Sequence, residues 1–467
     1  MENNTTKKEL PEGWEWTTLG RVIELEYGKS LPKRVRNQDG EFSVFGSNGI
    51  VGRHDEHLLD GPGVIVGRKG SAGVVHYTDK AYWPIDTTYF VQPKDKYVLK
   101  FIYFLLISLR LDNYDRSTAI PGLNRNDAYD IEVGIPHPTV QKQIVEKIEA
   151  LFSELDHAEA GMERNLRRLQ RYRQSLLRQA FSGALTADWR RDNPPAPASQ
   201  LLQQIAQARK AHHQQAIHDW QQALTQWEEA GKPGRKPTKS KAPKTLPPLT
   251  PEERAALPEI PEGWEWVRAN ELIDDIDNGY TPKANFLSPG DGEIPFLKVY
   301  NLKFDGTLNF KKDPYFIPDD IHKEKLKRSI TEPGDVLINI VGPPLGKVSI
   351  ATDQFKEWNI NQAIVRYRPN DFVSSKWLSY YMQDLHTITW LENTSKATAG
   401  QYNVKVSTCR ELPIPLIDIK EQTQIVNELE ERLSVVEQLE AATRTALLKS
   451  KNLRRSILQR AFEGKLV

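Results

Sequence analysis

Two long stretches of the chain carry an apolar residue at about every third or fourth position, with polar residues between them. The first runs from Pro138 to Phe181 with a single glycine, Gly161, and the second from about Asp418 to Phe462. This spacing predicts two amphipathic helices, each of some 40 residues and about 60 Å long. An apolar stripe of that length needs a partner, so we expect the two helices to pack together, related by an internal two-fold axis. The apolar positions are Ile144, Ile148, Leu151, Leu155, Leu166, Leu169, Leu176 and Leu177 in the first stretch, and Ile425, Leu429, Leu433, Val436, Leu439, Leu447, Leu453 and Leu458 in the second.

The segments before these helices, about 10–135 and 260–413, mix strand and helix patterns. Each contains a β-branched run just after a Pro-Gly pair, which favours a turn into a strand, and further on a helical spacing of apolar residues. The runs are Val64–Val66 and Val336–Ile338, and the helices are expected near Val98–Leu111 and Ser375–Leu391. We therefore predict an α+β protein with two similar mixed α/β domains separated by two long helices.

The two halves of the chain open and close in the same way. The opening Pro-Glu-Gly-Trp-Glu-Trp occurs twice, an Ile-Pro pair precedes a Gln-Ile-Val triplet in each half, and each half ends on Ala-Phe-x-Gly. Such repetition indicates one duplicated supersecondary unit. The repeated segments are 11–16 and 261–266, Ile135-Pro136 and Ile414-Pro415, 143–145 and 424–426, and 175–185 and 456–466.

The segment between the halves differs in composition from both of them. Residues 200–230 are rich in Gln and Ala, which predicts a third helix. Residues 232–244 then combine basic residues and prolines with no acidic residue. This composition is typical of a solvated linker, and contact with phosphate groups is the alternative.

Composition narrows the class of protein. The 467 residues include 63 Lys and Arg against 62 Asp and Glu, a net charge of +1, so any surface for nucleic acid must come from local segregation of charge. The single cysteine, Cys409, excludes a disulfide framework and is expected to be buried or to have no role. The N-terminus has no signal-peptide pattern, and the most apolar stretch, 101–111, is too short to span a bilayer. We expect a soluble cytoplasmic protein with no membrane partner.

Motifs for catalysis and metal binding are incomplete. Asn193-Pro194-Pro195-Ala196 lacks the aromatic fourth residue of adenine methyltransferases, and 342–347 is one residue too short for a phosphate-binding loop. Glu463-Gly464-Lys465 has a nuclease-like spacing but lies at a helix end. His212, His213 and His218 have no acidic or cysteine companion, so we expect no metal site and no catalytic residue.

Basic and amide side chains gather where loops are expected in both mixed domains. Lys and Arg contact phosphates, Arg pairs with guanine, and Asn and Gln pair with adenine. A solvated loop is the alternative for each residue alone, and a turn or cap is the alternative for Ser47-Asn48 and Asn361-Gln362. The predicted DNA-binding residues are Lys29, Arg34, Arg36, Ser47, Asn48, Arg53, Arg68, Lys69 and Ser71 in the first domain, and Tyr280, Lys283, Lys298, Asn301, Lys303, Lys347, Asn361, Gln362, Lys396 and Gln401 in the second.

The order of these features, found twice, resembles the specificity subunit of type I restriction–modification systems. The resemblance rests on the paired openings at Pro11 and Pro261, the helix starts after Ile135 and Ile414, and the Ala-Phe-x-Gly helix ends. It also rests on the Pro-Gly turn and strand of each half, which a glycine pair follows, Gly70 and Gly73 in the first half and Gly342 and Gly346 in the second. It covers nearly the whole chain except about 190–258.

The resemblance implies a non-catalytic chain that directs other subunits. Each mixed domain would be a target-recognition domain that reads one half of a bipartite, asymmetric site in double-stranded DNA, and the long helices would form an antiparallel coiled-coil spacer. Two methyltransferase subunits, using S-adenosylmethionine, and two motor–nuclease subunits, using ATP and Mg²⁺, would assemble on it, so this chain would bind no cofactor itself. The implied parts are a first recognition domain, a first spacer helix, an insert with a basic linker, a second recognition domain and a second spacer helix, at 1–137, 138–185, 186–258, 259–416 and 417–467.

Two other classes compete with this interpretation. A coiled-coil scaffold with two protein-binding heads would have no affinity for DNA. An enzyme, such as a fused nuclease or methyltransferase, would need the motifs that are incomplete here.

Overall fold

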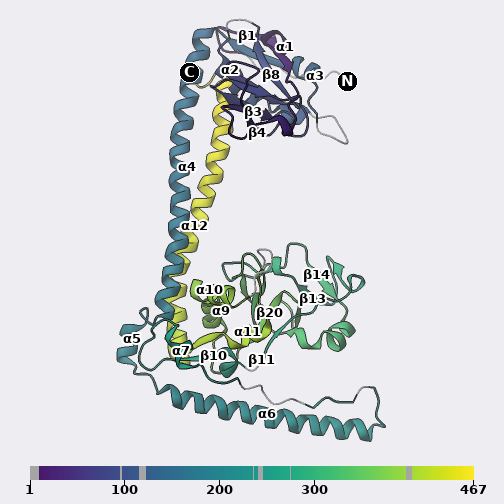
Figure 1. Ribbon diagram of the computed structural model, residues 1–467, viewed down its shortest axis with the longest axis vertical. Coiled ribbons are helices and arrows are strands. Elements are labelled where there is room, and N and C mark those ends of the chain that lie inside the picture. Colours follow the sequence, from purple (N-terminus) through teal and green to yellow (C-terminus); the bar gives the residue numbers. More distant parts are fainter. Residues whose placement is uncertain are drawn as a thin grey trace. The chain divides into compact units, whose positions relative to one another are not determined.

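The computed structural model describes residues 10–94, 97–114, 122–234, 236–239, 246–273, 275–395 and 402–467 (Figure 1). The chain forms two compact units. Unit 1 contains the chain up to Leu166 together with Ala441–Val467, and unit 2 contains Arg167–Glu440. Each unit therefore combines segments from both halves of the sequence.

Unit 1 is built on an antiparallel sheet of order β2-β8-β5-β6 and a smaller sheet of order β4-β3-β7, in which β3 and β7 are parallel. A separate pair, β1 with β9, joins the opening of the chain to the strand that leads into the first long helix. The strands are β1 (Trp14–Thr18), β2 (Ile23–Tyr27), β3 (Phe42–Gly46), β4 (Gly49–His54), β5 (Gly63–Gly67), β6 (Val75–Thr78), β7 (Tyr82–Pro84), β8 (Thr88–Pro93) and β9 (Glu132–Pro136), and the short helices are α1 (Leu19–Val22), α2 (Leu99–Ser108) and α3 (Arg125–Tyr129).

Unit 2 repeats this plan with additions. Its main antiparallel sheet has the order β11-β20-β16-β18, its second sheet β12-β14-β13-β19-β15 again contains one parallel pair, β13 with β19, and β10 pairs with β22. The strands are β10 (Glu265–Arg268), β11 (Asp275–Asn278), β12 (Ser288–Pro289), β13 (Ile294–Leu297), β14 (Tyr315–Ile317), β15 (Ile330–Thr331), β16 (Val336–Asn339), β17 (Val341–Gly342), β18 (Val348–Ile350), β19 (Trp358–Ile360), β20 (Ile364–Arg368), β21 (Tyr402–Asn403) and β22 (Pro413–Leu416). The helices are α5 (Ala187–Asp192), α6 (Ala198–Glu229), α7 (Pro251–Ala255), α8 (Ala269–Leu272), α9 (Ser375–Gln383), α10 (Leu385–Thr394) and α11 (Val406–Glu411).

The two long helices are α4 (Pro138–Phe181) and α12 (Ile419–Phe462), which confirms both predicted helices. Within each unit an end of α4 packs antiparallel to an end of α12. In unit 1, for example, the Ser450 hydroxyl donates to Glu159 at 2.6 Å. The stripe is buried only towards the helix ends, so its predicted extent is wrong at Leu439 and Leu453, which are 50% and 48% exposed.

A repeated glutamine explains why each long helix starts where it does. In unit 1 the buried Gln141 side chain accepts from the Val98 amide at 3.0 Å and donates to the Pro136 carbonyl at 2.9 Å. In unit 2 Gln422 likewise accepts from the Ser374 amide and donates to the Ile417 carbonyl, each at 2.9 Å. One amide therefore ties the first turn of the long helix to the segment that precedes the domain's own helix.

The repeated Ala-Phe-x-Gly ends and Pro-Glu-Gly-Trp openings pack on each other. Gly183 and Gly464 end α4 and α12 with positive φ angles of 74° and 68°, the left-handed conformation that glycine favours at helix ends. A Cβ on Gly183 would lie 2.2 Å from Pro261, and one on Gly464 would lie 2.1 Å from Pro11. The end of each half is therefore fitted to the opening of the other half.

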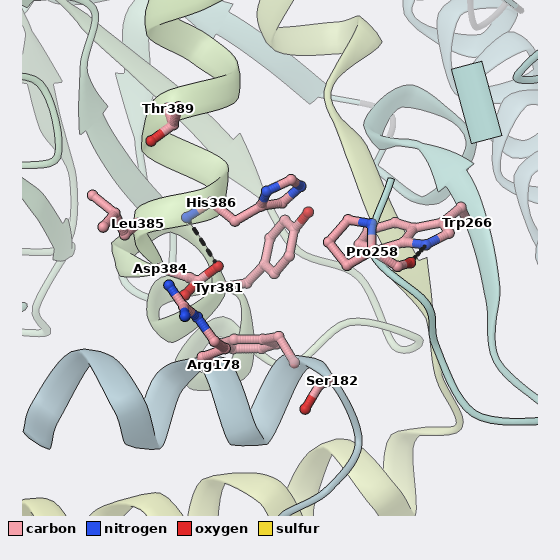
Figure 2. Close-up of a pocket in the computed structure, with 10 residues that line it drawn as sticks. Arg178, Ser182, Pro258, Trp266, Tyr381, Asp384, Leu385, His386 and Thr389 are labelled. Carbon is pink, nitrogen blue, oxygen red and sulfur yellow. Dashed lines mark hydrogen bonds between the residues drawn. The ribbon is translucent and has the colours of Figure 1, made fainter. Parts of the chain in front are cut away.

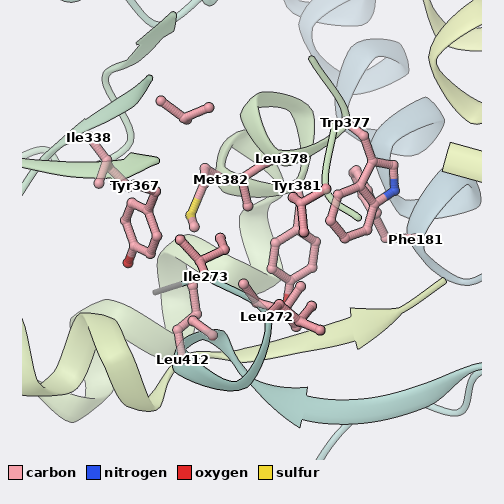
Figure 3. Packing of buried hydrophobic residues seen from close by; sticks show 14 of the residues in the cluster. Phe181, Leu272, Ile273, Ile338, Tyr367, Trp377, Leu378, Tyr381, Met382 and Leu412 are labelled. Atoms are coloured by element: carbon pink, nitrogen blue, oxygen red, sulfur yellow. The ribbon is translucent and has the colours of Figure 1, made fainter. Parts of the chain in front are cut away.

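Each unit has its own apolar core. In unit 2 the Trp377 and Tyr381 rings of α9 stack 5.9 Å apart, and Phe181 from the end of α4 meets them edge-on (Figure 3). In unit 1 Phe101 of α2 lies 5.2 Å from Phe462 at the end of α12. The cores therefore hold the ends of the long helices against the sheets.

Three further predictions meet the structure here. The helix expected at 375–391 is wrong as a single helix: the backbone of Asp384 is extended, and its carboxylate accepts from the His386 amide at 3.2 Å to begin α10. The third helix is confirmed as α6, and Cys409 is buried as expected. Among the helices of the described residues, none combines the length and apolar character needed to cross a membrane.

Candidate nucleic-acid interface

Loops from separate parts of the chain meet at one edge of the main sheet in unit 1. The chain leaving β2 is held there because the Gly28 amide donates to the Thr88 carbonyl at 3.1 Å and the Lys29 amide to the Pro84 carbonyl at 2.9 Å. The loop after β5 joins them through the Arg68 amide, which donates to the Thr87 carbonyl at 2.9 Å. Lys29 and Lys69 are exposed on these loops.

The buried side chain of Ser47 contacts the backbone of two of these loops. The residue is only 8% exposed, and its hydroxyl oxygen lies 2.6 Å from the Lys69 carbonyl oxygen and 2.7 Å from that of Thr87. Asn48, next to it in the turn between β3 and β4, is exposed. The side chain of Ser47 therefore holds the loop in place, while that of Asn48 faces solvent.

Arg68 belongs to a cationic cluster that sequence reasoning identified only in part. Its guanidinium lies 5.1 Å from the centre of the Tyr27 ring, and the guanidinium of Arg125, at the start of α3, lies 5.2 Å from the same ring. Burial raises the pKa of the neighbouring Tyr89 to about 12, so this hydroxyl adds no negative charge at neutral pH. Tyr27 and Arg125 were missed because they are far from Arg68 in sequence, and only the fold brings all three together.

Two other predicted residues of unit 1 already bond to backbone carbonyl groups of the same domain. The Arg36 guanidinium donates to the Leu31 carbonyl at 2.8 Å, and that of Arg53 donates to the Gly40 carbonyl at 2.6 Å. Arg34 is exposed, and Ser71 is half-buried in the loop after β5. The polar cluster at the sheet edge is thus centred on Tyr27, Arg68, Lys69 and Arg125, with Lys29 and Asn48 on neighbouring loops.

Unit 2 forms the same loop framework with different side chains. The Gly279 amide donates to the Ile364 carbonyl at 3.1 Å and the Tyr280 amide to the Ile360 carbonyl at 3.2 Å, which reproduces the arrangement of Gly28 and Lys29. Tyr280 is 61% exposed. The Thr281 hydroxyl donates to the amide oxygen of Gln362, and the Asn361 amide oxygen accepts from the Ala363 backbone in a turn.

Three of the predicted lysines of unit 2 lie against aromatic rings or a carbonyl group. The Lys298 ammonium lies 3.1 Å from the centre of the Tyr315 ring, and burial lowers the pKa of Lys298. The Lys347 ammonium lies 5.6 Å from the ring centre of Phe304, which is 51% exposed. The Lys303 ammonium donates to the Tyr300 carbonyl at 3.0 Å.

Of the four remaining predicted residues of this unit, two are described and two are not. Asn301 is 1% exposed and its amide is used inside the loop, accepting from the Lys298 backbone and donating to the Asn309 carbonyl. Its side chain therefore has no free edge for a base. Lys283 is exposed, and Lys396 and Gln401 lie outside the described residues.

Each unit also has a cavity beside the end of a long helix. In unit 2 a cavity of about 470 Å³ is lined by Phe181 and Arg178 of α4 and by Tyr381, Asp384 and His386 (Figure 2). Burial raises the pKa of the Asp384 carboxyl group. Unit 1 has a cavity of about 760 Å³ lined by Phe462 and Gln459, the repeat equivalents of Phe181 and Arg178. The cavity therefore recurs where the sequence repeats.

Across the residues that the structure describes, no three His, Cys, Asp or Glu side chains come together in a group that could hold a metal ion.

Comparisons with known proteins agree with this architecture. The family described as "Type I restriction modification DNA specificity domain" matches residues 11–161 and 261–449. The EcoDI specificity subunit of Escherichia coli is 24% identical, with the alignment covering 98% of this chain and 89% of that one, and the EcoKI specificity subunit of E. coli strain K12 is 21% identical over 98% and 90%. A solved structure from work on the complex assembly and conformational transition of the type I R-M system matches 98% of this chain and 99% of its own with a TM-score of 0.62 and 18% identity, which supports the fold. The chain therefore belongs to the type I restriction–modification DNA specificity family and is a specificity subunit of that kind.

Proposed function

We propose that this chain recognises a bipartite, asymmetric target in double-stranded DNA, one half through each unit. The observation that carries the proposal is the equivalent loop framework, in which the amides of Gly28 and Gly279 make matching bonds while the side chains around them differ. Unit 1 presents Tyr27, Arg68 and Arg125, and unit 2 presents Tyr280 and Gln362. Equal frameworks with unequal side chains suit two half-targets of unlike sequence.

The long helices would set the gap between the half-targets. Each has 44 residues, about 66 Å at 1.5 Å per residue, and each contributes one end to each unit. A continuous helix has a fixed rise, so its length would translate into a fixed number of unread base pairs.

We propose further that two methyltransferase subunits and two motor–nuclease subunits assemble on this chain. The recurrence of the helix-end cavity, lined by Phe181 in unit 2 and by Phe462 in unit 1, supports binding of the same kind of partner twice. The partners would hold S-adenosylmethionine, ATP and Mg²⁺ and carry out adenine methylation and DNA cleavage. This chain would determine the DNA sequence at which the partners act.

Sequencing of modified bases tests the proposal directly. DNA is taken from cells that express this chain with its methyltransferase partner, and a second strain carries the chain with residues 10–135 exchanged for those of a relative. We expect a split methylated motif in the first strain and a change in only one half of the motif in the second.

The scaffold alternative predicts a different result. A soluble complex of the expected stoichiometry that leaves no new methylation would contradict the proposal and favour a scaffold with two protein-binding heads. A change in both halves of the motif after the exchange would contradict the assignment of one half-target to each unit.

A further inference from the structure

The insert of unit 2 forms a defined arm, which we take as residues 198–234 and 236–239. The arm is α6 together with the described residues that follow it, 232–234 and 236–239. Its first turns are anchored: Ile205 is 2% exposed in the unit 2 core, and the Arg209 guanidinium donates to the Glu271 carbonyl at 3.1 Å. Beyond these residues α6 runs along unit 2, below its sheets in the view of Figure 1.

The segment after α6 turns back and is bonded to the helix. The indole N–H of Trp227 donates to the Pro233 carbonyl at 2.8 Å, and that of Trp220 donates to the Pro237 carbonyl at 3.1 Å. The two tryptophans are seven residues apart, about 10.5 Å along a helix, and the two prolines are four residues apart, about 12 Å in an extended proline-rich chain. The spacings match, so the segment is fitted to the helix and is more than a solvated linker.

This fitted segment is strongly cationic. Lys232, Lys236 and Lys239 are exposed on it, and the Lys239 ammonium lies 5.4 Å from the centre of the Trp220 ring. The sequence from 230 to 251 contains six basic residues and no acidic one. Holding like charges in one strip costs free energy unless a counter-charge neutralises them. An extended anionic partner would neutralise the lysines of this strip, in addition to the exposed Glu228 and Glu229 at the end of α6.

We propose that the arm is a second DNA-binding surface that contacts phosphate groups through Lys232, Lys236 and Lys239 and is indifferent to base sequence. The inference rests on the proposed function, which brings DNA to this chain. Ammonium groups bind phosphates as point charges and carry no information about bases. An extended strip of lysines suits a duplex backbone, whose charges continue along its whole length.

The salt dependence of DNA binding tests this surface. The complex of the full chain with its methyltransferase partner is titrated onto a duplex that carries the methylated motif and onto a scrambled duplex, from 50 to 200 mM KCl. In K232A/K236A/K239A we expect the slope of log affinity against log salt to become shallower by up to about 2.7, since each lost contact removes about 0.9. Between 50 and 200 mM KCl the affinity of the wild type would then fall by a factor about 40 times larger than the factor by which the affinity of the variant falls.

The triple arginine variant K232R/K236R/K239R is the matched control, and it should keep the wild-type slope because it keeps the charges. Affinity of the alanine variant should fall by the same factor on both duplexes. An unchanged slope in the alanine variant overturns the proposal. Loss of the methyltransferase partner with an unchanged slope would overturn it in favour of a protein-docking arm.

A second variant tests whether the fitted geometry matters. W220F/W227F keeps an aromatic ring at each position and all the lysines but removes the two indole donors. We expect weaker binding to both duplexes, because the freed segment must be ordered when it binds. Unchanged binding contradicts the fitted strip. If the wild-type complex itself does not distinguish motif from scrambled duplex, the proposed function fails, whatever the arm does.

Discussion

At the scale of single residues, the cluster around Tyr27 shows how a cationic surface is built on this fold. The guanidinium groups of Arg68 and Arg125 both lie about 5 Å from the centre of one ring, so two positive charges share the Tyr27 ring. The ring attracts each cation and reduces the cost of bringing them together. Such an arrangement leaves the outer donors available to a phosphate or a guanine.

Charge reversal at this cluster should weaken DNA binding by the complex. In R68E/K69E two cations become two anions at the edge of the sheet, so affinity should fall and the salt slope should become shallower. The measurement is a DNA titration of the complex at several salt concentrations. Lys80→Glu, an exposed charge reversal elsewhere in unit 1, controls for reversing a charge away from the cluster and should have little effect. An unchanged slope in R68E/K69E would show that this cluster does not contact DNA.

The single thiol should be unreactive in the folded chain. Cys409 is 0% exposed, and burial raises the pKa of its thiol from 9.0 to about 12, so almost no reactive thiolate exists at pH 8. A chromogenic disulfide reagent should therefore label the native protein very slowly and the urea-unfolded protein rapidly, with one equivalent in each case. Fast labelling without denaturant would mean that the α11 segment opens readily.

At the scale of elements, the sequence predicted both long helices, and for α4 the predicted ends, Pro138 and Phe181, are those of the structure. The prediction was possible because the helical spacing of apolar residues continues over 44 residues with no internal proline. It failed where a single side chain redirects the backbone. Asp384 splits the predicted helix because its carboxylate caps α10, and the apolar spacing continues across the break. Ser47 and Asn301 were predicted to contact DNA, and both side chains are buried: Ser47 bonds to the Thr87 carbonyl, 40 residues away, and Asn301 bonds to the Asn309 carbonyl of its own loop.

The first turn of α12 also carries a buried carboxylate, whose role could not be predicted from the sequence. Glu421 is 1% exposed and accepts from the Arg190 guanidinium, the Thr186 hydroxyl and the Trp264 indole, each at 2.8 Å. It therefore joins α12 to α5 and to the opening of the second half of the sequence.

Removal of this carboxylate should be costly. In Glu421→Ala the Arg190 charge loses its partner, so we expect the free energy of unfolding of unit 2 to fall by about 3–5 kcal/mol. This free energy is measured by urea unfolding, with the labelling of Cys409 as the signal for the unfolded state. Glu431→Ala, an exposed substitution on the same helix, should change the free energy by less than about 0.5 kcal/mol. Equal losses in the two variants would contradict a special role for Glu421.

At the scale of the whole molecule, duplication and exchange of ends explain the order of the motifs. Pro11 packs on Gly464 in unit 1, and Pro261 packs on Gly183 in unit 2, so each unit is closed by a segment from the other half of the sequence. The repeat of the opening and closing motifs was visible in the sequence. That the partners are exchanged between halves was not, because the motifs are identical in both and their pairing depends on where the long helices end.

Because each unit contains a helix end from the other half of the sequence, we can predict which segments lose protection from amide hydrogen exchange together. The cores share no residue, so Phe101→Ala should weaken unit 1 and Trp377→Ala unit 2, each by about 3–5 kcal/mol. Hydrogen exchange measured by mass spectrometry should show Phe101→Ala speeding exchange in the sheets of unit 1 and also in the last turns of α12, where Ile457 and Leu458 join that core. Trp377→Ala should instead affect the last turns of α4 and accelerate Cys409 labelling, which Phe101→Ala should leave unchanged. Faster exchange throughout both units in either variant would mean that α4 and α12 couple the cores into one cooperative unit, and the assignment of separate stabilities would be wrong.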